Sequence, residues 1–137
     1  MDVSGRRLWV RALLLAGVAY AAIGIVFAAL AVDANHVRVW RLAAWVASAV
    51  VAAAHIWYEQ YRLGSSPRPT ALHAAGAVGV GAFGLAVAAN VHWLLAGTHG
   101  QRPPLLALPV WPVITALPAF LAALAVAAVL ARFSPRA

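Results

Sequence analysis

The sequence predicts an all-α fold: an integral membrane four-helix bundle with up-down-up-down topology and both termini in the cytoplasm. Apolar residues make up 65% of the chain and charged residues 9%, against roughly 45–50% and about 25% in soluble domains. Such a chain has too little polar surface to cover itself in water, so lipid is its expected solvent. At 137 residues it has room for a single transmembrane domain spanning 1-137.

Four apolar segments justify the number of helices. Each reaches or approaches the roughly 20 residues that a helix needs to cross the hydrocarbon core. They contain no Asp, Glu, Lys or Arg, and they are Ala12–Val32, Leu42–Tyr58, Thr70–Gln101 and Leu105–Ala131. With their flanks, we expect helices over about 9–32, 40–62, 70–96 and 107–132.

The first segment also has features of a signal peptide. Arg6 and Arg7 precede its apolar run, and small residues follow it. The run is longer than the ~7–15 apolar residues of such peptides, so we expect a retained helix.

The arginines justify the orientation. Seven of the ten basic residues fall on one side of a four-pass arrangement and three on the other; the seven are Arg6, Arg7, Arg11, Arg62, Arg68, Arg132 and Arg136, and the three are Arg38, Arg41 and Arg102. Positive charge stays on the cytoplasmic side, so we expect the termini and the middle loop there, in an inner membrane.

Attraction to anionic headgroups explains the net charge of +7, and no nucleic-acid partner is expected because the arginines form no patch with exposed aromatic residues.

Small residues recur at four-residue spacing in the first and third segments. The third segment contains Ala77 and Gly81, and the first contains Gly17 and Ala21. Helices in lipid associate through close backbone contact at such positions, so we expect small-residue packing with the third helix at the centre.

Polar side chains of the second helix fall on one face. Alternating steps of four and three residues place them there: Arg41, Trp45, Ser48, Ala52, His55, Glu59 and Arg62. A polar stripe on a membrane helix normally points into the bundle or towards water. After it, the run "LGSSPRP" returns the chain, which brings His55, Glu59 and His73 together near the cytoplasmic interface.

Three interpretations of these residues are open. In the first, the cluster is structural: Glu59 pairs with Arg62 or Arg68, and His73 forms a hydrogen bond near the start of its helix. In the second, His55, Glu59 and His73 bind a divalent metal such as zinc or iron, or His55 and His73 are the axial ligands of haem b. In its general architecture the chain resembles four-helix membrane cytochromes of b type, which implies an electron-transfer module.

In the third interpretation, Glu59 exchanges protons in a small proton-coupled transporter. Glu59 is the one carboxylate near the membrane interior. The chain is similar in size and helix count to small four-helix multidrug exporters. Those place their working glutamate in the first helix, where this chain has Tyr20 as its one polar side chain larger than serine.

No catalytic pattern is present, so we expect no enzyme activity. Asp2 and Asp33 are terminal or in a loop, no phosphate-binding loop occurs, and the absence of cysteine excludes thiolate and disulfide chemistry. We expect an accessory or assembly subunit of a larger membrane complex, whose partners are the lipid bilayer and either other membrane protein subunits or a second copy of the chain.

Overall fold

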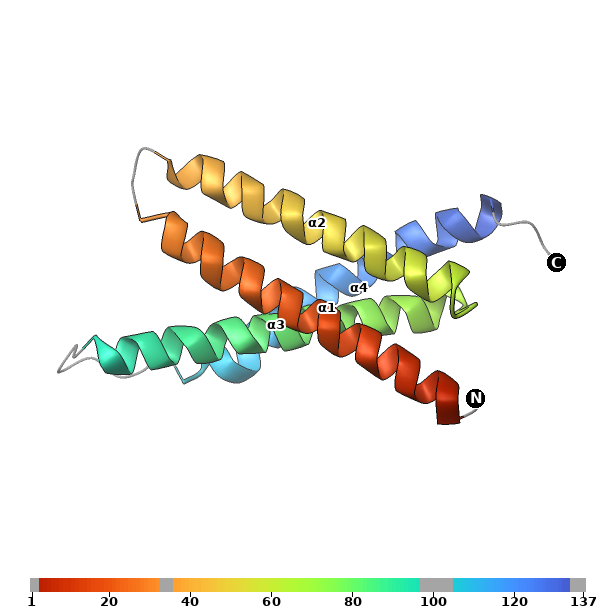
Figure 1. The fold of residues 1–137 in the computed structure, drawn as a ribbon, viewed down its shortest axis with the longest axis horizontal. Helices are drawn as coiled ribbons and strands as arrows, with labels where there is room; N and C mark the ends of the chain where they lie inside the picture. Colours follow the sequence, from red (N-terminus) through yellow and green to blue (C-terminus); the bar gives the residue numbers. More distant parts are fainter. Residues whose placement is uncertain (1–2, 33–35, 97–104, 134–137) are drawn as a thin grey trace.

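The computed structural model describes residues 3–32, 36–96 and 105–133, which form four α-helices (Figure 1). They are α1 (Val3–Leu30), α2 (Val37–Tyr61), α3 (Pro67–Leu95) and α4 (Ala107–Phe133). Each helix is long and apolar enough to cross a membrane. The predictions of an all-helical fold and of four candidate membrane spans are therefore confirmed, and the chain is a multi-pass membrane protein.

The connection between α2 and α3 follows from its glycine and prolines. Gly64 has φ +63°, a left-handed conformation that costs a residue without Cβ little. Pro67 then opens α3 in the first turn, where a missing N–H breaks no helical hydrogen bond. This is why α3 begins at Pro67, three residues before the expected start at Thr70.

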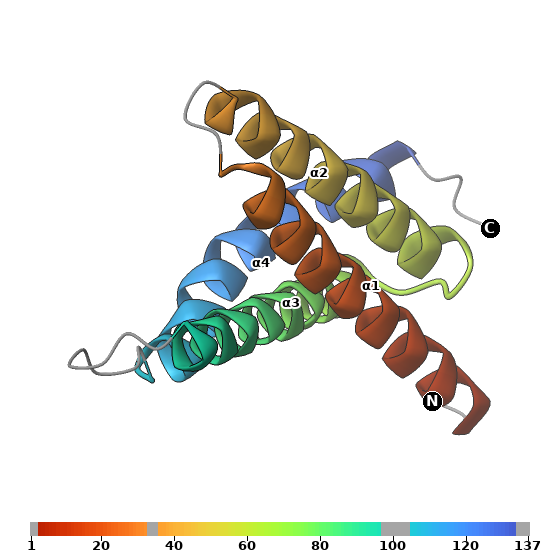
Figure 2. The ribbon, with the colours of Figure 1, turned by 60° about the vertical axis from the view of Figure 1, so that its left-hand side comes forward.

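The helices are arranged around α3, which packs along α4 and crosses α1 (Figures 1 and 2). The start of α1, the connection 62–66 and the end of α4 lie towards one end of the molecule, called the Ser65 end. At the opposite end, called the Arg41 end, the pair α1 and α2 diverges from the pair α3 and α4 in both views. As a result, α2 reaches α3 and α4 only near the Ser65 end, where all of its buried residues lie.

Two glycines, Gly17 and Gly81, lie where α1 and α3 are in contact. A Cβ atom added to Gly81 would overlap the Cβ of Tyr20 and would lie 3.1 Å from the carbonyl oxygen of Gly17. A Cβ on Gly17 would lie 2.7 Å from Cγ1 of Val80. Gly79, by contrast, faces α4 with ordinary space, since its added Cβ would be 3.8 Å from that of Ala116. Around Gly17 and Gly81, α1 and α3 therefore leave too little space for a Cβ atom unless a neighbour shifts.

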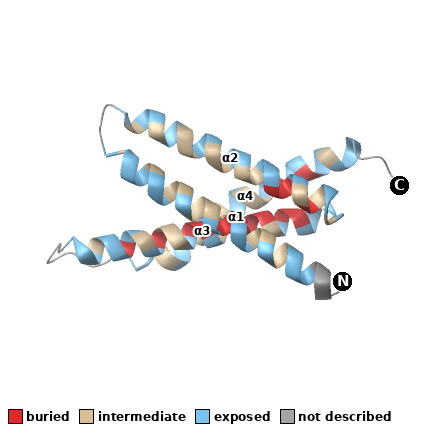
Figure 3. Cartoon of the chain, in the orientation of Figure 1, coloured by how far each residue is buried: buried red, intermediate tan, exposed pale blue. Residues whose placement is uncertain are grey.

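The buried apolar core is small and consists almost entirely of alanine. One cluster joins α2, α3 and α4 near the Ser65 end, and it contains Ile56, Ala71, Ala74, Ala123 and Ala127. Figure 3 shows buried residues along α3 and on α2 near this end, with half-buried and exposed residues over the rest of the helices. Large apolar side chains cover that surface, as expected when lipid surrounds the chain.

Candidate functional site

The polar stripe of α2 is buried at one end and exposed at the other. His55 and Glu59, one turn apart, have exposed fractions of 6% and 0%. Trp45, on the same face nearer the Arg41 end, is 77% exposed. Of the remaining polar members, Ser48 is half-buried and Arg41 and Arg62 are exposed. The stripe points into the bundle only over its last turns.

Glu59 is held by the connection and by α3. The hydroxyl of Ser65 donates to Oε2 of Glu59 at 3.0 Å, and Nδ1 of His73 lies 3.0 Å from the same oxygen. Ser65 reaches the carboxylate because the turn at Gly64 carries the chain back over the end of α2, where the backbone N–H of Ser65 also donates to the carbonyl of Glu59. These contacts offset part of the large cost of burying a carboxylate.

The other helices join the same cluster. The His73 ring stacks on the Trp9 ring of α1, with centroids 4.3 Å apart and planes 1° from parallel. Beside Glu59, the side-chain amide of Gln60 donates to the carbonyl of Ala127 in α4 at 2.8 Å. We call Trp9, His55, Glu59, Ser65 and His73 the Glu59 cluster. Together with Gln60, this cluster connects all four helices at the Ser65 end.

The expected pairing of Glu59 with Arg62 or Arg68 is wrong. Both arginines are exposed, and the carboxylate accepts instead from Ser65 and approaches His73. Long arginine side chains reach towards water and headgroups, whereas Ser65 is fixed against the carboxylate by the turn. Ser65 was missed in the sequence, although a hydroxyl residue directly after a turn glycine was a signal that could have identified it.

The structure brings His55, Glu59 and His73 into one region without arranging them around one point. In the described ranges 3–32, 36–96 and 105–133, no group of three or more His, Cys, Asp or Glu side chains is placed to hold a metal ion. A groove beside His55 does not include His73 in its lining. The divalent metal set and the haem b pair of His55 and His73 therefore stay predictions.

Three atoms of the Glu59 cluster keep open hydrogen-bonding capacity. Nε1 of Trp9, Nε2 of His55 and Oε1 of Glu59 are buried and have no hydrogen-bond partner. An unmet buried polar group costs about 1–3 kcal/mol. Such groups often mark places where a protein exchanges protons or binds a polar species. The Glu59 cluster thus joins the helices and also contains three buried polar atoms that take no part in those contacts.

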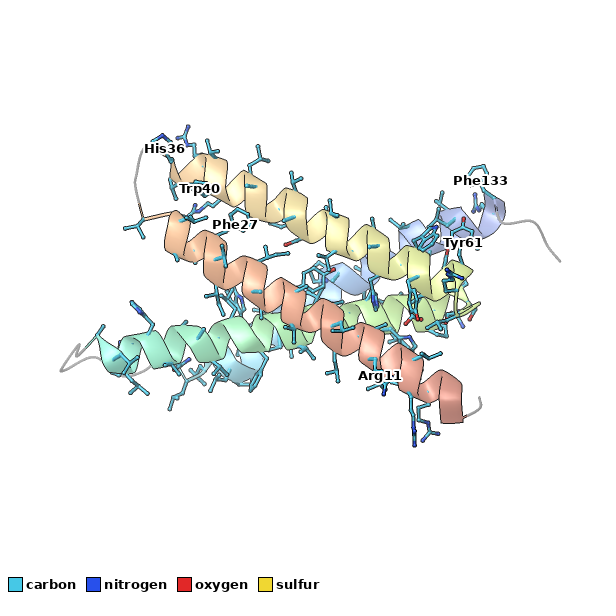
Figure 4. All side chains as sticks on the ribbon, viewed as in Figure 1. Arg11, Phe27, His36, Trp40, Tyr61 and Phe133 are labelled. Atoms are coloured by element: carbon cyan, nitrogen blue, oxygen red, sulfur yellow. The ribbon has the colours of Figure 1, made fainter. Side chains whose placement is uncertain are left out.

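The Arg41 end has a different character. Arg41 lines a shallow groove between α1 and α2 together with Phe27 and Trp40, whose rings are tilted and 6.1 Å apart. Figure 4 shows Phe27 and Trp40 between the two helices near His36, and Tyr61 and Phe133 at the other end. Around Trp45, the stripe of α2 has no covering from α3 or α4.

Comparisons with protein-family models, with curated proteins and with solved structures find no match to this chain.

Proposed function

We propose that the chain is an inner-membrane protein of up-down-up-down topology, with its termini and the connection 62–66 in the cytoplasm, and that it acts as an accessory or assembly subunit of a larger membrane complex. The observation that carries this proposal is the exposure of the α2 stripe at the Arg41 end, where Trp45 is 77% exposed. A transmembrane helix of a partner protein would cover it.

Position along the helix supports this assignment. Trp45 is eight residues beyond Val37, which at 1.5 Å per residue is about 12 Å along α2, and Ser48 lies about 5 Å deeper. Both are therefore further from the helix end than interfacial anchoring requires. Polar groups at this depth normally face another protein surface. The partner helix is expected to present a hydrogen-bond acceptor opposite Arg41 and Ser48.

A photo-crosslinking residue at position 45 tests the proposal in the membranes of the native host. We expect a covalent product with a different membrane protein, identified by mass spectrometry. The matched control is position 57, because Trp57 is also an exposed tryptophan of α2 but is twelve residues away and about 120° around the helix. A chain that yields no product at position 45, or a product only with a second copy of itself, would contradict the proposal.

The proposed orientation has its own test, because the chain contains no cysteine. Single cysteines at the exposed positions Ser66 and His36 would react with a membrane-impermeant maleimide from opposite sides. We expect labelling of position 36 from outside intact cells and of position 66 only after the cells are opened. Labelling of position 66 in intact cells would reverse the orientation.

A second candidate function is proton-coupled transport through Glu59. It is favoured by the complete burial of this carboxylate and by two unpartnered buried atoms, Oε1 of Glu59 and Nε2 of His55 one helical turn away, since ionisable groups inside membrane proteins commonly serve transport. In proteoliposomes with an imposed proton gradient, we expect an ion flux that Glu59→Gln removes. Ser66→Ala is the control, because Ser66 is exposed and makes no side-chain capping bond. An unchanged flux in Glu59→Gln would exclude this role.

A further inference from the structure

A groove between α1 and α2 borders the Glu59 cluster, whose His55 is one of its lining residues. Its volume is about 520 Å³. It forms because Ala12 of α1 and Ala54 of α2 are too small to fill the space between the larger side chains of Leu8, Leu15 and Tyr58. Leu8 and Leu15 are themselves exposed, so the groove opens onto the surface that faces lipid.

The dimensions of the groove match one acyl chain within one leaflet. On α1 its lining extends from Leu8 to Ala16 and on α2 from Val51 to Tyr58, which corresponds to about 10–12 Å of helix. One leaflet contributes about 15 Å of hydrocarbon. The walls are almost wholly aliphatic or aromatic, which suits a hydrocarbon chain.

Arg11 gives the groove a charge preference. It lines the groove and is exposed, and Figure 4 shows it on the first third of α1. Arg7, also exposed, lies one turn before it on nearly the same face. The part of α1 that the structure describes contains no acidic residue, and Glu59 is fully buried. Among the residues that the structure describes, no exposed acidic side chain therefore compensates the positive charge at this groove.

From these observations we infer that the groove is a binding site for an anionic glycerophospholipid, with one acyl chain between α1 and α2 and its phosphate on Arg11. An anionic headgroup at the membrane surface gains about fivefold in affinity from each nearby basic side chain. A lipid bound at this site would contact both α1 and α2, next to the position where α2 separates from α3 and α4.

Native mass spectrometry of the full chain in detergent tests the site with phosphatidylglycerol and phosphatidylcholine of identical acyl chains. We expect phosphatidylglycerol to bind about fivefold more tightly. Arg11→Gln removes this difference, whereas Arg38→Gln, an exposed arginine at the Arg41 end, preserves it. Equal binding of the two lipids, or an unchanged preference in Arg11→Gln, would overturn the inference. Displacement of the lipid by inorganic phosphate would overturn it as well.

The acyl chain is tested separately. Ala54→Phe fills the groove and should weaken both lipids at least fivefold, while Ala53→Phe, at an exposed neighbouring position outside the lining, should weaken neither. In the unaltered chain, phosphatidylglycerol with a diazirine on its acyl chain should label Leu15 or Val51. Labelling spread evenly over the exposed faces of all four helices would mean bulk lipid contact and would overturn the site, whatever the folding of the variants.

Discussion

The two ends of α2 both have polar side chains on the same helix face, but this face is buried at one end and exposed at the other. At the Ser65 end, His55 and Glu59 are buried, and Glu59 contacts both the connection 62–66 and α3. At the Arg41 end, Trp45 and Arg41, on the same face of the same helix, are exposed. One periodic stripe thus includes a segment that the chain buries itself and a segment that it leaves uncovered. Periodicity identifies a face that requires a partner, and the fold decides whether that partner is in the same chain.

The largest expected effect tests whether the Glu59 cluster holds the Ser65 end together. His73→Leu leaves the buried carboxylate with Ser65 alone and removes the stack on Trp9. We expect it to lower the free energy of unfolding by about 3 kcal/mol, measured by reversible unfolding in mixed micelles. His92→Leu, at an exposed position of the same helix, should change it by less than about 0.5 kcal/mol.

A double-mutant cycle sharpens this test. In the Glu59→Leu variant, no buried carboxylate loses its partner when His73 is replaced. His73→Leu should therefore lower the free energy of unfolding by about 1 kcal/mol or less in this variant. If His73→Leu and His92→Leu lowered the free energy of unfolding of the unaltered chain by the same small amount, the Glu59 cluster would not be what stabilises the Ser65 end.

The next effect concerns the middle of the molecule, where α1 crosses α3. Gly81→Ala forces a Cβ atom against Tyr20 and the backbone of Gly17, and we expect it to cost about 2 kcal/mol because the two helices must separate. Gly79→Ala is the matched control, since its Cβ makes ordinary contact with Ala116. There alanine should be neutral or stabilising by up to about 1 kcal/mol. Equal stabilities for the two variants would show that close approach at Gly81 contributes little.

A smaller effect separates two adjacent serines. Ser65→Ala removes one hydrogen bond to Glu59 and should lower the free energy of unfolding by about 1 kcal/mol. Ser66 is the N-cap of α3 but makes no side-chain capping bond, so Ser66→Ala should have an effect below about 0.5 kcal/mol. The reverse order would mean that the helix cap, and not the buried carboxylate, is the important contact of the connection.

The smallest effect compares two tryptophans, one at each end. Trp9→Leu removes the stack on His73 and should cost about 0.5–1 kcal/mol. Trp45→Leu should leave the free energy of unfolding of the isolated chain within about 0.5 kcal/mol, because its ring contacts little of the protein. A large loss of stability in Trp45→Leu would mean that the Arg41 end is closed in solution, and the comparison between the two ends would fail.

The four helices could be predicted because long charge-free segments leave a membrane chain few alternatives. The stripe on α2 could be located for the same reason, since helix geometry fixes which residues share a face. The nearness of Glu59 and His73 followed from the length of the connection between their helices.

The hydroxyl partner of Glu59 could not be predicted, because its position depends on the backbone angle at Gly64. That angle, and not charge, selects Ser65 over Arg62 and Arg68. Which part of the stripe would be buried depended on the direction in which the α1 and α2 pair leaves α3. The four-residue spacing of small residues identified Gly17 and Gly81 as packing positions, but it did not give the angle at which α1 and α3 cross there.

The Glu59 cluster also constrains how the chain enters the membrane. Ribosomes deliver α2 before α3, so Glu59 reaches the bilayer before His73 and Ser65 are in place. Until α3 inserts, the carboxylate is expected to remain hydrated near the headgroups. Docking of α3 then buries it. The first two helices should therefore form an unstable intermediate of biogenesis that membrane quality control recognises. Insertion of the third helix then completes the fold.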